Sequence, residues 1–176
     1  GLSDSFHPCQ LLADLLTYKE ARGSIENKKV VWLGDGNNMC HSYMNAARIF
    51  NFQLVISCPK EFIPDSEILK FSKENTSLEH DPCKAVDSAD LVVTDVWASM
   101  GQENDQENRK EKFEKYQVNL EIMSKAKDDS LFMHCLPAHR GEEVTEEVLE
   151  GPQSIVWEEA GNRLHSQKAL LEFLLI

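Results

Sequence analysis

The stretch Leu131–Pro137, which reads LFMHCLP, decides the fold. Its first three residues form an apolar run that is too short for a helix, and this favours a strand covered on both faces. Pro137 cannot donate to a sheet ladder and disfavours helical backbone at Leu136, so the strand has to end here. The sequence therefore places His134 and Cys135 at the carboxyl end of a buried strand, where open α/β sheets bind their ligands.

Working outward, further β-rich runs alternate with helical patterns along the chain. Besides the strand at 131–134, strands are expected at 29–33, 53–58, 90–94 and 154–157. Helices are expected at 3–22 (capped by Ser3 or Asp4), 38–50, 66–75, 82–88, 116–127, just after Thr145, and at 162–176. This alternation predicts an α/β fold, a doubly wound and mostly parallel sheet of about five strands with helices on both faces.

Polar clusters follow four of the predicted strands. They occupy residues 35–38, 95–101, 134–137 and 158–163. Because the carboxyl ends of parallel strands meet at one edge of a sheet, these clusters predict a single site. The strongly charged segment 102–115 mixes acids and bases, which indicates a solvated loop or lid rather than a binding patch.

Composition limits the class of protein. The chain has 176 residues, which fits one domain with a sizeable core. Its net charge of -12 argues against nucleic acid or an anionic membrane as partner, although a few local cations could hold a small anion. The five cysteines form no C-x-x-C pair, so neither a disulfide framework nor a closed zinc site is indicated, and a reducing cytoplasm fits best. No apolar run reaches membrane-spanning length, and the absence of an initiator Met indicates a processed chain or a fragment.

The loop Gly34–Asn38 leads from the first strand into a helix and resembles a dinucleotide-binding turn. Two features exclude that assignment: Met39 occupies the third glycine position, and the next strand ends near Cys58 without an acidic residue. We therefore expect no nicotinamide or flavin cofactor. The backbone N–H groups of the loop, at a helix start, suit a carboxylate.

Two other clusters have more than one interpretation when taken alone. His7 and Gln10 at the start of the first helix could bind an anion or a carbonyl oxygen, or could be a solvated capping pair. Asp95 at a strand end could hold an ammonium group or cap a helix.

Taken together, these segments resemble the ornithine carbamoyltransferase family. His-Pro-x-Gln at 7–10, Gly-Asp-Gly-Asn-Asn at 34–38, Asp-x-x-x-Ser-Met-Gly at 95–101 and His-Cys-Leu-Pro at 134–137 occur in the family's order and spacing. The resemblance covers essentially the whole chain and points to the carboxyl-terminal ornithine-binding domain. It implies an interdomain helix at 1–22, the α/β domain at 23–161, and a terminal helix at 162–176 that returns toward a first domain.

The resemblance implies transfer of the carbamoyl group of carbamoyl phosphate to the δ-amino group of L-ornithine, giving citrulline and phosphate. It implies that the α-amino and carboxylate groups of ornithine are held by Asn38, Asp95, Ser99 and Met100. For carbamoyl phosphate it implies the residues His7, Pro8, Cys9, Gln10, Cys135, Leu136 and Arg163. Cys135, Asp95 and Arg163 would act in catalysis, and neither a cofactor nor a metal is expected.

The first domain of this family, with its Ser-x-Arg-Thr phosphate loop, is absent from these residues. We therefore expect the chain alone to be inactive and the full-length enzyme to be a cytoplasmic homotrimer or larger assembly in arginine metabolism. Without the first domain, apolar stripes on the two end helices are expected to be exposed. They comprise Leu11, Leu12, Leu15, Leu16, Leu164, Leu170, Leu171, Leu174 and Leu175.

Two other classes remain open from the sequence. A cysteine hydrolase would use Cys135 as its nucleophile, but His134 lies on the opposite face of the strand, so His41, His139 or His165 would have to be the base. A non-catalytic amino-acid-binding domain would bind ornithine without turnover.

Overall fold

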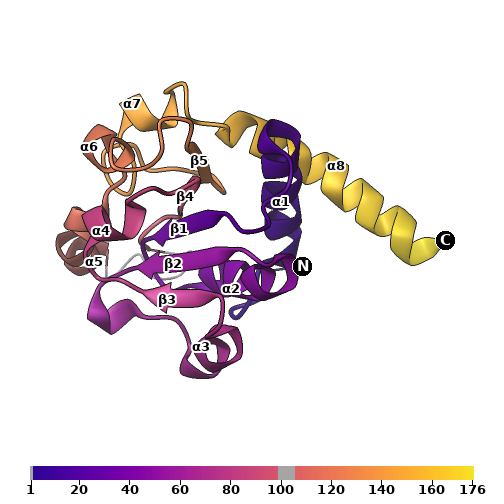
Figure 1. Ribbon diagram of the computed structural model, residues 1–176, viewed down its shortest axis with the longest axis horizontal. Helices are drawn as coiled ribbons and strands as arrows, with labels where there is room; N and C mark the ends of the chain where they lie inside the picture. The colour runs from indigo at the N-terminus through magenta and orange to yellow at the C-terminus, as the bar shows by residue number, and fades with distance from the viewer. Residues whose placement is uncertain (1, 99–105) are drawn as a thin grey trace.

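The computed structural model describes residues 2–98 and 106–176. Five parallel strands form one sheet in the order β3-β2-β1-β4-β5 (Figure 1). Their bounds are β1 Lys29–Leu33, β2 Gln53–Ser57, β3 Thr76–Leu78, β4 Leu91–Thr94 and β5 Leu131–His134. The α/β fold with a parallel sheet is confirmed.

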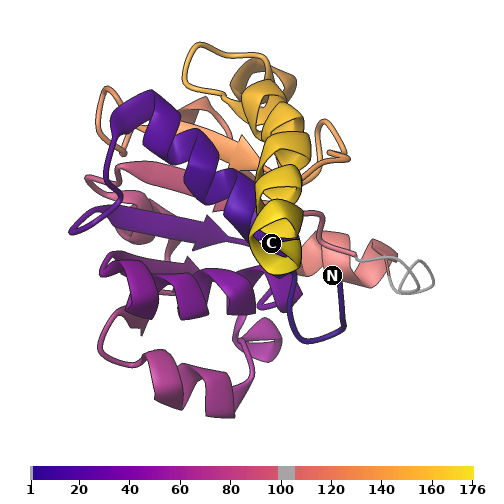
Figure 2. The same cartoon turned by 90° about the vertical axis from the view of Figure 1, so that its right-hand side faces the viewer.

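The helices alternate with these strands along the chain. They are α1 Pro8–Arg22, α2 Asn38–Phe50, α3 Ser66–Ser72, α4 Pro82–Val86, α5 Gln106–Phe113, α6 Leu120–Met123, α7 Glu146–Leu149 and α8 Val156–Leu175. Short 3₁₀ turns occupy Lys60–Phe62 and Glu114–Tyr116. Helices α1 and α8, from opposite ends of the chain, lie side by side (Figure 2).

Alternation along the strands separates two hydrophobic cores. One core joins Trp32 of β1 and Met133 of β5 to residues of α1 and α2, including Tyr18 and Met44. The other core lies on the opposite face of the sheet, against α4, α6 and α7, and contains Val31, Val92, Phe132, Val86, Met123 and Val148. Both faces of the sheet are therefore covered, which explains the continuous apolar strands.

The strand order sets the position of the site. From β1 the chain proceeds outward to β2 and β3, and then returns to place β4 and β5 on the other side of β1. The order of the strands therefore reverses between β1 and β4. Ligand sites of open α/β sheets form outside the carboxyl ends of strands at such a switch point.

Two strand predictions were wrong. Thr76–Leu78 was not among the expected strands, but it pairs with β2 as the edge strand β3. The stretch 154–157 was expected to be the fifth strand, but only Ser154 pairs, in an isolated bridge with Phe132, and α8 begins at Val156. The two β-branched residues there are too few to extend the ladder before the helical sequence begins.

Several helix bounds also differ from the prediction. Helix α1 begins at Pro8 rather than at residue 3, because proline fits the first helical turn and disfavours helical backbone at His7 before it. Ser3 instead closes a turn with Phe6. Helix α8 begins at Val156 rather than at 162, and the helix expected at 116–127 shortens to Leu120–Met123.

The charged segment at 102–115 is not simply a solvated loop. Its described part forms α5 and a 3₁₀ turn, in which Phe113 and Tyr116 are buried. Together with Trp97 and Phe62 they form a small aromatic cluster beyond the carboxyl ends of the strands. The acidic and basic composition concealed these aromatic anchors.

The predicted exposure of the leucine stripes on the end helices is confirmed for α8 but not for α1. On α1, Leu11 is buried and Leu15 packs against the core, so most of that stripe is covered by this domain. Leu164 is 71% exposed, Leu174 65% and Leu175 80%, on the part of α8 that projects away from the sheet (Figure 1).

Candidate functional site

The carboxylate of Asp95 is the meeting point of three strand-end loops. Asp95 follows β4 and is 8% exposed. The Cys135 thiol, after β5, donates to Asp95 Oδ1 at 3.0 Å. The Asn37 amide, after β1, donates to Asp95 Oδ2 at 2.7 Å. The predicted convergence of the strand-end clusters is therefore observed for β1, β4 and β5.

The Cys135 thiol is neutral in this environment. Burial raises the pKa of the thiol well above its ordinary value, and the neighbouring Asp95 carboxylate raises it further. A reactive cysteine nucleophile needs the opposite shift, toward a thiolate. Cys135 is therefore arranged as a hydrogen-bond donor.

The neighbouring His134 is fully buried and has both ring nitrogens engaged. Its Nδ1 accepts from the Leu136 N–H at 2.9 Å, so the ring proton lies on Nε2, which donates to Glu143 Oε1 at 3.0 Å. His134 therefore cannot act as a base for Cys135. Ligand atoms of Asp95, His134 and Cys135 lie within 4.8 Å of one another, but a metal would have to break these hydrogen bonds.

The other candidate base in the core of the domain is also occupied. His41 Nδ1 lies 3.0 Å from the Ser5 carbonyl oxygen, and its Nε2 accepts from the Asp65 N–H at 3.0 Å. The thiol of Cys135 is paired with a carboxylate instead of an imidazole. The geometry thus disfavours the cysteine hydrolase.

Leu136 has strained backbone just after the edge strand β5. Its φ of 47° lies in the left-handed region, and its peptide bond to Pro137 is cis. Left-handed backbone at such a residue costs of the order of 1–3 kcal/mol and persists only where surrounding contacts enforce it. Here the enforcing contact is the bond from its N–H to His134.

The start of α1 meets α8 beside this loop. Gln10 is buried, and its amide oxygen accepts from Nη1 of Arg163. Its amide nitrogen donates to Asp14 Oδ1 at 2.9 Å and to Glu159 Oε1 at 3.0 Å. Segments that are about 150 residues apart in sequence are therefore joined beside the loop after β5.

His7 and Arg163 each keep an unused buried polar atom. His7 Nδ1 and Arg163 Nε have no hydrogen-bond partner among the described residues. Burial lowers the pKa of the His7 imidazole, and the Arg163 guanidinium lowers it further, while Asp95 opposes both. Of the other predicted residues here, Pro8 is exposed and Cys9 is half-buried. This end of the site can receive an oxygen-rich anionic group.

Of the four residues predicted to hold ornithine, the structure places only Asp95 at the centre of the site among those it describes. Asp95 lies at the centre of the site, but the Asn38 amide donates to the Ser3 carbonyl oxygen at 2.8 Å, and its neighbour Asn37 contacts Asp95. Ser99 and Met100 lie outside the described residues.

A buried ion pair next to the site was not predicted. The Arg109 guanidinium of α5 pairs with Asp35 after β1, and its Nε donates to the Trp97 carbonyl oxygen. The guanidinium carbon lies 4.5 Å from the centre of the Phe62 ring. Burial raises the pKa of Asp35 although Arg109 lowers it. In the sequence, the only indication of this ion pair was a single arginine within the charged segment 102–115.

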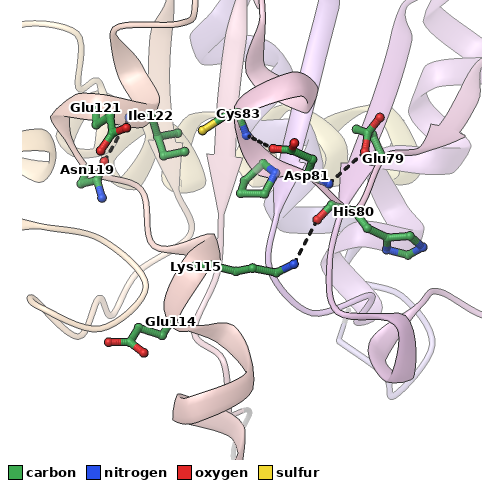
Figure 3. A pocket seen from close by; sticks show the side chains of 10 residues that line it. Glu79, His80, Asp81, Cys83, Glu114, Lys115, Asn119, Glu121 and Ile122 are labelled. Atoms are coloured by element: carbon green, nitrogen blue, oxygen red, sulfur yellow. Dashed lines mark hydrogen bonds between the residues drawn. The ribbon is translucent and has the colours of Figure 1, made fainter.

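A pocket of about 570 Å³ opens near the end of β3 (Figure 3). Its lining includes four acidic side chains and Lys115, which donates to the His80 carbonyl oxygen. Asp81 and Asn119 in the lining cap α4 and α6 respectively. None of the lining residues belongs to the predicted site, and the polar groups serve local structure, so this pocket is not the candidate site.

Among residues 2–98 and 106–176, the structure contains no helix that is both long enough and apolar enough to cross a bilayer.

Two curated relatives are ornithine carbamoyltransferases. That of Methylococcus capsulatus is 61% identical over 99% of this chain and 59% of the relative. That of Nitrosococcus oceani is 61% identical over 100% of this chain and 58% of the relative.

The solved structures that resemble this chain are also ornithine carbamoyltransferases. The ornithine carbamoyltransferase of Burkholderia thailandensis has a TM-score of 0.91 and 50% identity, covering 100% of this chain and 57% of its own. That of Pyrococcus furiosus has a TM-score of 0.92 and 50% identity, covering 97% of this chain and 57% of its own. This chain thus spans less than two thirds of the proteins it resembles. Residues 26–174 match the family described as "Aspartate/ornithine carbamoyltransferase, Asp/Orn binding domain", and the chain belongs to that family.

Proposed function

We propose that the chain is the ornithine-binding part of an ornithine carbamoyltransferase. In the proposed reaction the neutral δ-amine of L-ornithine attacks the carbonyl carbon of carbamoyl phosphate. A C–N bond forms, the C–O bond to phosphate breaks, and the proton that the amine loses leaves with the phosphate. The observation that carries the proposal is the Asp95 carboxylate, which is buried at the switch point and contacted by Cys135 and Asn37.

Asp95 is the proposed partner of the ornithine α-ammonium group. Its two oxygens accept from a neutral thiol and a neutral amide, which leaves its charge without a cationic partner in these contacts. A positively charged ligand group would supply that partner in a desolvated site. Asn38, Ser99 and Met100 are proposed to complete the ornithine site, as the family resemblance implies.

His7 and Arg163 are the proposed contacts of carbamoyl phosphate. The guanidinium, with the unused His7 Nδ1, would stabilise negative charge that develops on the carbonyl oxygen and on the leaving phosphate. The Gln10 amide nitrogen already donates to Asp14 and Glu159, so only its amide oxygen can bind a ligand. This oxygen can accept a hydrogen bond from the carbamoyl N–H.

Cys135 is proposed to orient the δ-amine as a thiol, and not to deprotonate it as a thiolate. The support is the raised pKa of the thiol beside Asp95. Leu136, fixed in left-handed backbone by its bond to His134, is the proposed backbone contact for the carbamoyl amide.

Further parts of the proposal concern the whole protein. The phosphate loop and the rest of the carbamoyl phosphate site would come from the part of the relatives that this chain does not match. We propose a cytoplasmic enzyme that acts as a homotrimer or larger assembly. A role in arginine synthesis is supported by a relative from Pseudomonas aeruginosa that is named the anabolic enzyme and is 55% identical.

The test uses a completed chain, defined here as this chain joined to the unmatched part of the Methylococcus capsulatus relative. The completed chain should form citrulline from ornithine and carbamoyl phosphate. Asp95→Asn should raise the KM for ornithine roughly 10- to 100-fold, because a charge-assisted hydrogen bond contributes about 1.5–3 kcal/mol. The KM for carbamoyl phosphate should change little.

Asp129→Asn is the matched control, because it makes the same change at an exposed carboxylate. Asp129 precedes the amino end of β5, whereas the site lies at the carboxyl end. It should leave both KM values unaltered. No citrulline from a folded completed chain would reject the activity, and equal losses for both substrates in Asp95→Asn would reject the assignment of Asp95.

A further inference from the structure

Two buried carboxyl groups lie behind the site and are used by nothing in the proposed reaction. Asp14 of α1 is 2% exposed and Glu159 of α8 is 1% exposed. Asp14 accepts from Gln10 on Oδ1 and from the Tyr43 hydroxyl on Oδ2, the latter at 2.9 Å. Glu159 accepts from Gln10 on Oε1 and from the His134 N–H on Oε2, the latter at 3.0 Å. All four carboxyl oxygens therefore have a donor.

These bonds fix two parts of the site at once. Because both acids accept from the Gln10 nitrogen, the Gln10 amide cannot turn over, and its oxygen is held toward Arg163. Because Glu159 also accepts from the His134 backbone, it holds the last residue of β5 directly before Cys135. A single carboxyl group thus connects the α1 and β5 segments of the site.

We propose that Asp14 and Glu159 are positioning residues, which together fix the Gln10 amide and the end of β5 relative to Arg163. This inference rests on the proposed function, because its readout is carbamoyl transfer. Neither acid is proposed to touch a substrate. Their effect is transmitted through Gln10 and the backbone of His134.

The protonation of the pair fits this role. Burial raises the pKa of Asp14 to about 6, and it raises that of Glu159 well above its ordinary value, with Asp14 raising it further. The other titratable or charged groups that face the pair are Tyr43 from α2, Cys135 after β5 and Arg163 from α8. Two adjacent buried carboxyl groups share a proton because both cannot ionise together. A pair with one proton can hold the Gln10 amide without mutual repulsion.

Substituting Glu159 by glutamine discriminates positioning from packing. Glutamine keeps the shape of the side chain, but it has one accepting oxygen, and Glu159 accepts on both oxygens. The new amide nitrogen must face either the Gln10 amide nitrogen or the His134 N–H, and both are donors. The backbone N–H of His134 is fixed by the strand, so the remaining oxygen of residue 159 stays with it and the new amide nitrogen faces that of Gln10. Glu159→Gln therefore leaves the Gln10 amide held by Asp14 alone, against a facing donor, and keeps the end of β5 in place.

The corresponding change at Asp14 should be milder. In Asp14→Asn the amide oxygen can still accept from Gln10, and the new amide nitrogen can donate to the Tyr43 hydroxyl oxygen. The Gln10 amide keeps its orientation in this variant. We therefore expect a graded effect, with Asp14→Asn between the unaltered protein and Glu159→Gln.

The experiment measures steady-state kinetics of the completed chain and its variants, together with thermal unfolding. Glu159→Gln should lower kcat/KM for carbamoyl phosphate about tenfold to a hundredfold, as expected for small displacements of positioned groups. The KM for ornithine should stay within about twofold, because Asp95 and Asn37 are not bonded to the pair. Glu158→Gln is the matched control, since it changes an exposed glutamate one residue earlier on α8.

The outcomes separate cleanly. No citrulline from the unaltered completed chain would reject the proposed function before any variant is compared. If the unaltered chain is active, two results each overturn the positioning role: kinetics of Glu159→Gln equal to those of Glu158→Gln, or equal losses for both substrates. Failure of all the Asp14 and Glu159 variants to fold would also overturn it, in favour of a purely structural role.

Discussion

Gly36 lies in the loop between β1 and α2, where a side chain has no room. A Cβ built there would lie 2.4 Å from the Pro64 nitrogen, 2.7 Å from the Ile63 carbonyl carbon and 2.8 Å from the Phe62 carbonyl oxygen. All three neighbours are backbone atoms, so they cannot yield by changing a rotamer. The Gly36 N–H also donates to that Phe62 oxygen at 2.9 Å. Gly36→Ala therefore forces the chain at 62–64 away from the loop that carries Asn37.

The magnitude follows from two contributions. Overpacking a rigid contact costs about 1–3 kcal/mol. Loss of the hydrogen bond to Phe62 adds about 0.5–1.5 kcal/mol. We expect Gly36→Ala to lower the free energy of unfolding by roughly 2–4 kcal/mol, a large part of the 5–15 kcal/mol that is typical of a domain.

Gly161→Ala is the matched control, and it should raise the free energy of unfolding instead of lowering it. Gly161 lies inside α8, and a Cβ there would meet no atom within 4 Å. Alanine should stabilise this exposed helical position by about 0.5–1 kcal/mol. Both variants are compared with the parent chain by urea unfolding followed by tryptophan fluorescence. If Gly36→Ala unfolds at the same urea concentration as the parent, the backbone at 62–64 is free to move, and the packing argument for this loop is wrong.

Three other predictions follow from the same contacts. Arg109→Met should destabilise the protein by about 3–5 kcal/mol at neutral pH by leaving Asp35 buried without its cation. Because the folded-state pKa of Asp35 is already raised, this deficit should shrink as the pH falls and Asp35 is protonated; a deficit that is constant with pH would contradict the reasoning. Alkylation of Cys135, followed by mass spectrometry, should be slow at neutral pH, accelerate with rising pH, and be slowed by L-ornithine; equal rates with and without ornithine would remove Cys135 from the site. The 176-residue chain should form no citrulline, and it should self-associate in sedimentation experiments, because each exposed leucine forgoes about 1.5–3 kcal/mol of burial. Leu171→Lys and Leu174→Lys together should reduce this association. A parent chain that is already monomeric would contradict the prediction.

The fold could be predicted largely from local patterns. Strand β1 and helix α2 agree with their predicted bounds because an apolar β-rich run, a tight loop and the Asn37 cap all indicate the same boundary. Strand β3 was missed because Thr76–Leu78 is three residues long and sits at the sheet edge, with little apolar signal. The strand predicted at 154–157 was wrong for the converse reason: two β-branched residues at the start of a helix gave a strand signal where no strand forms.

The site could be predicted where topology determines it. Asp95 and Cys135 meet because their strands are parallel neighbours, and this follows from the alternation of elements. Asp14 and Glu159 could not be predicted in this way, because a carboxyl group is rarely buried without a partner and their shared partner Gln10 lies 149 residues from Glu159. The spacing of Gln10 and Asp14, four residues apart on one helix, was the available signal.

The charges around the site bear on the proposal that carbamoyl phosphate also needs residues from the part of the relatives that this chain does not match. Asp95, Asp14, Glu159 and Asp35 lie in or beside the site, and the chain carries a net charge of -12. Against them, the guanidinium of Arg163 already bonds Gln10, and that of Arg109 is paired with Asp35. A phosphate group entering this field would meet more negative than positive charge, so the proposed binding of carbamoyl phosphate would require cations from outside these residues. The proposed phosphate loop of the unmatched part, with its arginine at a helix start, would supply positive charge, whereas the proposed contact of ornithine with Asp95 would not depend on that loop.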